Sequence, residues 1–409
     1  MKQFDIPFTY RSNLVNAIKE KRKREDKMKK DFTPTTVDCG NVIFYIARHF
    51  GFCYGVENAI EIAFKTIAEN KGKRIFLLSE MIHNPKVNED LIALGVQFLQ
   101  DTKGKMLVDF ETLTSDDIVI TPAFGTTVEI ENILKGKGIK IEKFDTTCPF
   151  VEKVWKRGEQ IAKNDYTIII HGKPTHEETR ATFSHAKENA ASIVINDMKE
   201  AILLSQYIKG EKKPSLFYED FRGRYSADFD MQKDLNRIGV VNQTTMLASE
   251  TQAIADFLKN TVIEKFKPVD EGSVFADTRD TLCYATNDNQ AAAFGLLNVP
   301  ADFAIVVGGY NSSNTTHLVE LAEQKLNCYF INDASKIISK DTIAHFDIHQ
   351  QEEVISHNYW SAEAPLRILL TSGASCPDAD VEKVIEKFLA LSDSPISVRT
   401  LEQRFTSVN

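Results

Sequence analysis

The sequence predicts an α/β protein in which one structural plan is used three times. Apolar, strand-like runs alternate with amphipathic helical patterns along most of the 409 residues, which is typical of α/β folds. Three cysteines, Cys53, Cys148 and Cys283, each follow an apolar run and each open a helical pattern. Because a single core rarely serves so long a chain, we expect two to four domains.

The alternation gives the elements in order along the chain. Strands are predicted, among other places, at 42–47, 74–78, 117–121, 139–144, 167–171, 192–196, 238–241, 303–308, 327–331 and 367–371. Helices are predicted at 56–69, 151–163, 247–265, 288–296, 315–325 and 379–390, where apolar residues recur at helical spacing.

Each cysteine is followed by the same series of features. A helix leads to a strand and a polar loop, and a second helix leads to a third strand and a loop of small residues. The polar loops are SEMIHNPKVNED, HGKPTHEETRA and GGYNSSNTTHL, and the small-residue loops are TPAFGTT, NQTTMLASET and TSGASCPD. Repetition at fixed spacing indicates duplicated units, and ligands of parallel α/β sheets bind at the carboxyl ends of the strands.

The repeat suggests how the chain is divided. We predict an N-terminal extension at 1–40 and three α/β domains at 41–147, 148–282 and 283–409, each with one of the three cysteines and the last with a C-terminal tail. The polar stretch 207–237 is predicted to be an insertion in the second domain. The charge run KEKRKREDKMKK at 19–30 is interpreted as a solvated helix or tail.

Composition excludes several classes of protein. The net charge of -9 argues against general nucleic-acid binding, which needs a basic face. No apolar run approaches the roughly 20 residues of a membrane span, and the N-terminus lacks a signal-peptide core. The six cysteines show no CxxC pair, which argues against a disulfide framework or a zinc ribbon. We therefore expect a cytoplasmic protein under reducing conditions.

The three repeated cysteines are candidate metal ligands. Exposed N–H groups and the dipole at a helix N-terminus lower the pKa of a thiol. Three such thiolates brought together form a soft ligand set suited to an iron–sulfur cluster, and three ligands in place of four leave one metal position open for chemistry. Free cysteines are otherwise commonly small buried hydrophobic residues, which we favour for Cys39, Cys328 and Cys376.

Histidines and carboxylates mark the polar loops. His83 and His176 occupy equivalent places and can donate to phosphate oxygens, whereas His171 is a weaker candidate. Glu178 would deliver a proton if it faced a buried anionic site, and Glu177 is expected to be a solvated residue at a helix start. On the sequence alone, the simpler interpretation of both carboxylates is favourable charge at a helix N-terminus.

Neutral hydrogen-bond donors gather in three clusters, NSSN at 311–314, QTT at 243–245 and GAS at 373–375. Such residues are the usual helix caps, and capping is compatible with anion binding because both use exposed N–H groups. Three clusters in equivalent positions suit a diphosphate. No GxxxxGK[ST] motif and no strong GxGxxG before a helix is present, so nucleotide hydrolysis and dinucleotide binding are poorly supported.

Taken together, these segments resemble one family, the LytB-type 4-hydroxy-3-methylbut-2-enyl diphosphate reductases. The matching pieces, in order, are GFCYGV, HN, DTTCPFV, HGKPTHEET, NQTT, DTLCYAT, NSSN and SGAS, spanning roughly residues 42–390. The long form, with Ala-Phe-Gly at 123–125, is similar to the branch of plants, cyanobacteria and some other bacteria.

The resemblance implies three pseudo-equivalent α/β domains in a trefoil around a central [4Fe-4S] cluster. It implies that Cys53, Cys148 and Cys283 bind the cluster, and that the fourth iron stays open for the substrate hydroxyl. The implied reaction is a reductive dehydration that yields isopentenyl or dimethylallyl diphosphate, the last step of the non-mevalonate isoprenoid pathway. Its two electrons would come from a ferredoxin or a flavodoxin, without nucleic-acid or membrane partners.

The resemblance also assigns residue roles. Glu178 corresponds to the proton donor, Thr244 lies beside the substrate hydroxyl, and His176 shares the catalytic site. The implied contacts to substrate and diphosphate are His83, His176, Thr244, Ser312, Ser313, Asn314 and Ser375, with Asn84 and Gln243 as further candidates. Many bacterial members have a diphosphate-binding histidine where this chain has Phe124. The resemblance leaves that role to N–H groups near Gly125 and Thr126, or to another side chain.

Two other functions stay open on the sequence. One is a different [4Fe-4S] dehydratase of the quinolinate-synthase type, whose dicarboxylate substrate would call for arginine, whereas the polar loops present His, Ser and Asn. The other is a non-enzymatic iron–sulfur redox sensor, against which the acidic charge weighs because no basic DNA-reading helix is visible.

Overall fold

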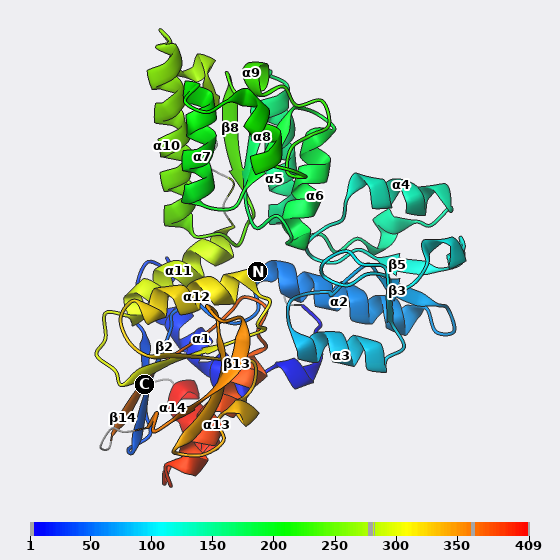
Figure 1. Ribbon diagram of the computed structural model, residues 1–409. Helices are drawn as coiled ribbons and strands as arrows, with labels where there is room; N and C mark the ends of the chain where they lie inside the picture. The colour runs from blue at the N-terminus through cyan, green and yellow to red at the C-terminus, as the bar shows by residue number, and fades with distance from the viewer. Residues whose placement is uncertain (1–3, 277–280, 282, 361–364, 408–409) are drawn as a thin grey trace. The chain divides into compact units, whose positions relative to one another are not determined.

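Two compact units make up the chain (Figure 1). The computed structural model describes residues 4–276, 281, 283–360 and 365–407. Unit 1 consists of Met1–Glu57, His83–Lys86 and Tyr284–Asn409, and unit 2 consists of Asn58–Ile82 and Val87–Cys283. Both units alternate strands and helices, so the predicted α/β class is confirmed. No helix in the described ranges is long and apolar enough to cross a membrane.

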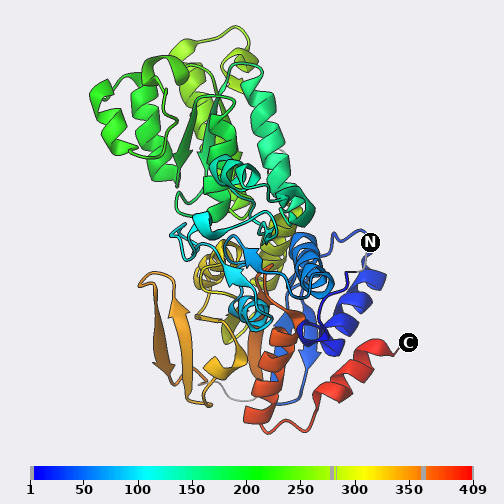
Figure 2. The ribbon, with the colours of Figure 1, turned by 90° about the vertical axis from the view of Figure 1, so that its right-hand side faces the viewer.

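Unit 1 contains one five-stranded sheet of order β1-β2-β14-β10-β11. Its strands are β1 (Thr35–Asp38), β2 (Val42–Ile46), β10 (Phe303–Val307), β11 (Cys328–Ile331) and β14 (Leu366–Ser372). All neighbours are parallel except β1, which pairs antiparallel with β2 at one edge. An antiparallel hairpin of β12 (Thr342–Asp347) and β13 (Glu352–His357) follows β11 (Figure 2).

Helices from both ends of the chain cover one face of this sheet. The helices of unit 1 are α1 (Asn13–Glu25), α11 (Tyr284–Leu296), α12 (Ser313–Glu323), α13 (Asp378–Leu391) and α14 (Val398–Thr406). Helix α1 lies against α13 and α14, and its residues Leu14, Val15 and Ile18 enter the core of the sheet (Figure 2). Residues 19–25 of the segment interpreted as a solvated helix or tail are thus the second half of α1, whose first half is buried, and residues 26–30 follow the end of the helix.

Unit 2 contains two parallel sheets. The first has the order β4-β3-β5 and the second the order β7-β6-β8-β9. The strands are β3 (Ile75–Leu77), β4 (Gln97–Phe98), β5 (Ile118–Ile120), β6 (Thr167–His171), β7 (Ser192–Ile195), β8 (Ile238–Asn242) and β9 (Phe275–Ala276). The helices are α2 (Tyr54–Glu69) and α3 (Pro85–Ala93), which begin in unit 1, and α4 (Val128–Gly136), α5 (Pro149–Ala162), α6 (Glu177–Lys187), α7 (Met198–Lys209), α8 (Pro214–Asp220), α9 (Met231–Asp234) and α10 (Ala248–Phe266).

Helices bury both faces of the second sheet. In Figure 1, α7 and α10 lie on one side of β8, and α5 and α6 lie on the other. Ile169 joins the core on the α7 and α10 side, whereas Ile168 and Ile170 join the core on the α5 side. Parallel strands that are buried on both faces read as continuous apolar runs, which explains the sequence TIIIH.

The three sheets repeat one strand order, as the sequence pattern predicts. The first strand after each cysteine helix is central, namely β3, β6 or β10. The second strand of the repeat lies on one side (β4, β7 or β11), and the third lies on the other side (β5, β8 or β14).

The strand that leads into each cysteine joins the sheet of the preceding repeat. Strand β2 leads to Cys53 and pairs with β14, and β9 leads towards Cys283 and pairs with β8. Before Cys148 this pairing is reduced to one parallel bridge between Thr121 and Asp145. This pairing between repeats is cyclic, because β2, the strand that leads into the first repeat, joins the sheet of the last repeat.

Strand β2 pairs with the C-terminal strand β14 and so belongs to the five-stranded sheet of unit 1. One strand prediction is corrected by the structure. The predicted strand at 139–144 is wrong, since Ile141–Phe144 form a 3-10 helix. Alternating Ile and Lys residues suit a strand locally, but only the neighbouring Asp145 reaches a partner strand.

The stretch 207–237 lies within unit 2. It contains α8 and α9 and contributes Phe217, Phe221 and Phe229 to the core beside α7 and α10. The rings of Phe217 and Phe229 stack at a centroid distance of 5.4 Å. The segment is therefore polar on average but anchored by three buried aromatic side chains.

We expect Phe44→Ala to lower the unfolding midpoint, because Phe44 is fully buried on β2 and meets Phe388 of α13 edge to face at 6.0 Å. Loss of a buried phenylalanine costs about 3–5 kcal/mol. Denaturant unfolding followed by circular dichroism measures the shift. The matched control is Phe8→Ala, where the side chain is 75% exposed. Equal midpoints for the two variants would show that β2 is not a core strand of unit 1.

Candidate functional site

The candidate residues gather at the N-termini of helices. Cys148 is the N-cap of α5, and Cys53 and Cys283 stand directly before α2 and α11. His176 is the N-cap of α6, and Ser312 is the N-cap of α12. The first N–H groups of a helix have no partner within the helix, and together with the helix dipole they favour anionic ligands.

Two of the cysteines are held by the same kind of contact. The backbone N–H of Cys53 donates to the carbonyl of Ala374 at 3.1 Å, and that of Cys148 donates to the carbonyl of Ala123 at 3.0 Å. Both carbonyls belong to the small-residue loop of the preceding repeat. The Cys53 and Cys148 side chains are half-buried, whereas Cys283 is buried. A thiol at a helix start beside a loop of small residues fits the ligand set of an iron–sulfur group.

The other three cysteines are structural, as predicted. Cys39, Cys328 and Cys376 are all buried. Burial raises the pKa of the Cys39 thiol to about 12, and it also raises the pKa of the Cys328 and Cys376 thiols. A thiol that resists ionisation is a poor metal ligand, because the thiolate is the binding form.

Glu178 and Thr244 form a buried pair in unit 2. The Thr244 N–H donates to Glu178 Oε1 at 2.5 Å, and the Thr244 hydroxyl contacts Oε2 at 3.0 Å. Both residues are buried, with Glu178 only 1% exposed. A buried carboxyl group is tolerated when it is hydrogen-bonded, and the Oε2–Oγ1 contact gives a proton on Glu178 a hydroxyl to move along.

His176 is oriented from two sides. Its Nδ1 accepts the backbone N–H of Glu178 at 3.1 Å, which assigns the proton of the neutral ring to Nε2. The Phe124 ring meets the His176 ring edge to face at 5.5 Å. The residue that replaces the histidine of many bacterial members thus contacts another histidine of the site. The Gly125 N–H, a predicted substitute donor, is instead bonded to the Pro122 carbonyl at 3.0 Å.

Gln243 holds two loops of the second sheet together. Its Oε1 accepts from the Lys173 N–H at 3.1 Å and from the Thr179 hydroxyl at 2.9 Å, and its Nε2 donates to the Thr245 hydroxyl at 2.6 Å. A Cβ added at Gly172 would lie 2.9 Å from the Gln243 Cβ. With its amide engaged in this way, Gln243 positions the loops around Glu178 and Thr244.

The expectation that Glu177 is solvated is wrong. Its side chain is 6% exposed, and Oε1 accepts from the Ser79 hydroxyl at 3.2 Å. Ser79 lies 98 residues away in the sequence, so no local sequence pattern predicts this contact.

The remaining predicted contacts meet in unit 1. The Ser375 hydroxyl donates to the His83 carbonyl at 3.1 Å and lies 3.5 Å from the Ser312 hydroxyl. The Asn314 Oδ1 accepts from the Ala374 N–H at 2.9 Å. Asn84 is buried, at 2% exposed. Three segments that are far apart in sequence therefore form one polar cluster.

Two buried polar atoms of this cluster have no partner in the described part of the chain. They are Ser313 Oγ and Asn314 Nδ2, in side chains that are 3% and 4% exposed. Buried polar groups are nearly always hydrogen-bonded, so such atoms indicate a polar ligand. Ser312, one residue earlier, differs because its hydroxyl caps α12 through the Thr315 N–H at 3.3 Å.

Two residues that shape the site were missed by the sequence analysis. The Asn88 amide accepts from the Met81 N–H at 3.1 Å and donates to the Ile82 carbonyl at 2.9 Å, which fixes the end of the loop before His83. Thr315 fills the space beside Gly373, where an added Cβ would lie 3.1 Å from the Thr315 Cβ. Thr315 opens the predicted helix 315–325, where a polar residue needs a partner when it is buried, whereas Asn88 lies in a predicted polar loop and gave no such signal.

Known proteins give an independent comparison. A family model described as "LytB protein" matches residues 44–389. A protein of Cyanothece sp. named 4-hydroxy-3-methylbut-2-enyl diphosphate reductase is 40% identical over 393 residues, covering 95% of this chain and 92% of that protein. A Microcystis aeruginosa protein of the same name is 39% identical over 386 residues, covering 94% of this chain and 90% of that protein.

Solved structures share the fold. A structure of (E)-4-hydroxy-3-methyl-but-2-enyl diphosphate reductase matches with a TM-score of 0.51 and 23% identity, covering 85% of this chain and 99% of that chain. A Plasmodium falciparum structure, titled E-1-hydroxy-2-methyl-but-2-enyl-4-diphosphate reductase, matches with a TM-score of 0.61 and 23% identity, covering 86% and 88%.

Neighbouring serines give a prediction for the ligand-free protein. Ser313→Ala should leave the unfolding free energy unchanged or slightly higher, because it removes a buried hydroxyl without a partner. Ser312→Ala should lower it by about 1 kcal/mol through loss of the helix cap. Denaturant unfolding of both variants checks this, and a clear destabilisation by Ser313→Ala would mean that its hydroxyl is already bonded.

Proposed function

The chain belongs to the LytB protein family, and on that premise we propose that it reduces (E)-4-hydroxy-3-methylbut-2-enyl diphosphate. The allylic carbon–oxygen bond breaks, two electrons and two protons are consumed, and one water leaves. The products are isopentenyl and dimethylallyl diphosphate. The observation that carries the proposal is the buried Glu178–Thr244 pair, which suits protonation of a leaving oxygen.

In this proposal Cys53, Cys148 and Cys283 hold a [4Fe-4S] cluster with the three repeats arranged around it as a trefoil. When bound, the cluster supplies electrons one at a time and a Lewis-acidic iron position for the substrate oxygen. The positions of all three cysteines at helix starts support this ligand set. The raised pKa of the Cys39, Cys328 and Cys376 thiols supports their exclusion, and the free state of the cysteines supports a reducing, cytoplasmic setting.

Glu178 stores the proton for the departing hydroxyl. In the ligand-free protein the Thr244 hydroxyl donates to Glu178 Oε2 at 3.0 Å. When Glu178 is protonated this hydrogen bond reverses, so that Thr244 accepts the proton and donates its own to the substrate oxygen. The Thr244 N–H stabilises the carboxylate that remains on Glu178. His176 presents its Nε2 proton, with its ring held by the Glu178 N–H and the Phe124 edge.

The diphosphate is held by neutral donors and helix N-termini. Ser313 Oγ and Asn314 Nδ2 gain the partners that they lack in the described part of the chain. The further contacts proposed are His83, His176, Ser312 and Ser375. Because the chain carries a net charge of -9, local donors and helix dipoles must bind the anionic substrate without help from the overall field. The electrons come from a ferredoxin- or flavodoxin-type protein.

An anaerobic assay of Glu178→Gln tests the function. With a reduced viologen dye as donor, the unaltered protein should form both C5 diphosphates from the hydroxylated substrate. Glu178→Gln keeps the size of the side chain but removes its acidic proton, so turnover should fall by about 10²–10⁴-fold while the cluster absorption stays. Failure of the unaltered, cluster-loaded protein to reduce this substrate would refute the proposal, and near-normal turnover of the variant would remove Glu178 from it.

Serine substitutions test the ligand set. Cys53→Ser, Cys148→Ser and Cys283→Ser should each reduce iron content and the visible cluster absorption of anaerobically purified protein, since a hydroxyl is a poor ligand for this group. Cys39→Ser is the matched control, because Cys39 is buried and its thiol resists ionisation. Loss of the cluster in Cys39→Ser alone would show that the proposed ligand set is wrong.

A further inference from the structure

A cavity of about 350 Å³ lies in unit 1 beside Cys53. Phe52, Cys53 and Tyr54 line one side, and Lys19, Lys23 and Lys29 of the N-terminal extension are among the other lining residues. The proposed catalytic residues Glu178 and Thr244 do not line it. The cavity beside Cys53, a proposed cluster ligand, is therefore lined by residues other than those to which the reaction chemistry is assigned.

The basic residues of this cavity belong to the most cationic segment of an acidic chain. Residues 19–30 contain eight lysines and arginines against three acidic residues, a net charge of +5, while the whole chain carries -9. The first half of α1 is anchored in the core by Leu14, Val15 and Ile18. An ordered helix thus holds a local positive charge next to Cys53.

Lys19 joins this segment to the start of α13 by an ion pair and to the loop before Cys53 by a contact with an aromatic ring. Lys19 Nζ lies 2.7 Å from Asp378 and 4.7 Å from the Phe50 ring centroid. An added Cβ at Gly51, which has a φ of +78°, would lie 2.9 Å from Lys19 Nζ. The positive φ favours glycine at this position, and the absence of a side chain lets Lys19 and Asp378 approach the backbone.

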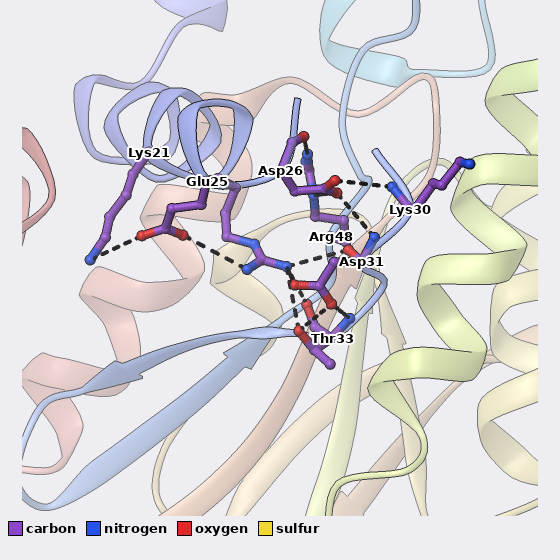
Figure 3. A network of polar contacts seen from close by, with 8 residues as sticks. Lys21, Glu25, Asp26, Lys30, Asp31, Thr33 and Arg48 are labelled. Carbon is purple, nitrogen blue, oxygen red and sulfur yellow. Dashed lines mark hydrogen bonds and ion pairs between the residues drawn. The ribbon is translucent and has the colours of Figure 1, made fainter. Parts of the chain in front are cut away.

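A second group of contacts fixes the end of α1 (Figure 3). Asp26 accepts the N–H groups of Lys30 and Asp31 at 3.2 and 3.0 Å, and it lies 3.7 Å from Arg48. Arg22 pairs with Asp31 at 3.0 Å. These contacts hold residues 26–31 in a defined path above Arg48, five residues before Cys53.

Four acidic residues, Glu20, Glu57, Asp288 and Asp378, line the cavity beside Lys19, Lys23, Lys29 and Arg48, so the excess of positive charge lies in the segment 19–30 around it. Asp378 is paired with Lys19, and Glu20 is paired with Lys23 at 3.1 Å. Burial raises the pKa of Glu57 and of Asp288, which favours their neutral forms. Further positive charge comes from residues of the same segment that do not line the cavity, namely Arg24, Lys27 and Lys30, all exposed.

Two exposed aromatic rings complete the surface. Tyr54 directly follows Cys53 and is 38% exposed, and Tyr284 directly follows Cys283 and is 41% exposed. Both line the cavity. Exposed tyrosines surrounded by charged residues are typical anchors of protein interfaces. Each of these two lies one residue from a proposed cluster ligand.

We propose that this surface, formed by Lys19, Lys23, Lys29, Tyr54 and Tyr284, is the docking site of an acidic one-electron carrier protein. The inference rests on the proposed function, which needs two electrons delivered singly. An acidic partner is repelled by a chain of charge -9, so a local basic surface is needed to steer it to the point of electron entry. Electron-transfer complexes are small, transient and sensitive to salt, which suits a few lysines around two tyrosines.

Binding of an acidic plant-type ferredoxin to the cluster-loaded, full-length protein tests the proposal. At low ionic strength, the double variant Lys23→Glu/Lys29→Glu should weaken binding in titration calorimetry by about tenfold or more, and high salt should shrink this difference. The charge-conserving variant Lys23→Arg/Lys29→Arg should bind normally. The matched control is Lys21→Glu, in the same helix as Lys23. Lys21 does not line this cavity, and its Nζ lies 5.3 Å from the Phe405 ring centroid.

Equal weakening by Lys21→Glu and by the double variant would overturn the docking site, as would unaltered binding by the double variant or no binding to the unaltered protein. Turnover with a reduced viologen dye is the second readout. It should be unchanged in the double variant, because a small dye does not need the docking surface. Since binding is measured directly, failure of the docking proposal is distinguishable from failure of the reductase function, which the dye assay reports.

Discussion

Pairing of β2 with β14 is the constraint on which the rest of unit 1 depends. It ties residues Val42–Ile46 to the C-terminal strand Leu366–Ser372, and it thereby brings the start of α2 to the small-residue loop after β14. The hydrogen bond from the Cys53 N–H to the Ala374 carbonyl follows from this pairing. The contact between Cys148 and Ala123 repeats the arrangement in unit 2. Each of these two cysteines is therefore positioned by the repeat before its own.

The parallel order of the strands explains why the polar residues lie at helix starts. In parallel sheets the carboxyl ends of all strands lie at one edge, and the next helix begins there. His176 and Ser312 cap helices that follow the central strands β6 and β10. The same geometry gives Cys53, His176 and Ser312 comparable positions beside the exposed N–H groups of a helix start.

The N-terminal extension is part of unit 1 and is not an appended tail. Its buried face adds Leu14, Val15 and Ile18 to the core. Its charged side reaches the loop before Cys53 through Lys19, which lies over the Phe50 ring, and through Asp26, which lies 3.7 Å from Arg48. One amphipathic helix thus serves stability through its apolar side and electrostatics through its basic side. The strongly charged end of α1 is tolerated because the apolar first half of the helix anchors it in the core.

The sequence by itself determined the α/β class, the threefold series of elements and the cysteines at helix starts, because these depend on residues a few positions apart. It did not determine which sheet β2 joins, since strand pairing connects residues more than 300 positions apart. Only the tertiary structure decided that Glu177 is buried against Ser79 and that Glu178 meets Thr244. It also decided that Phe124 lies against His176. Those contacts arise from packing between loops that are far apart in the sequence, for which local periodicity carries no signal.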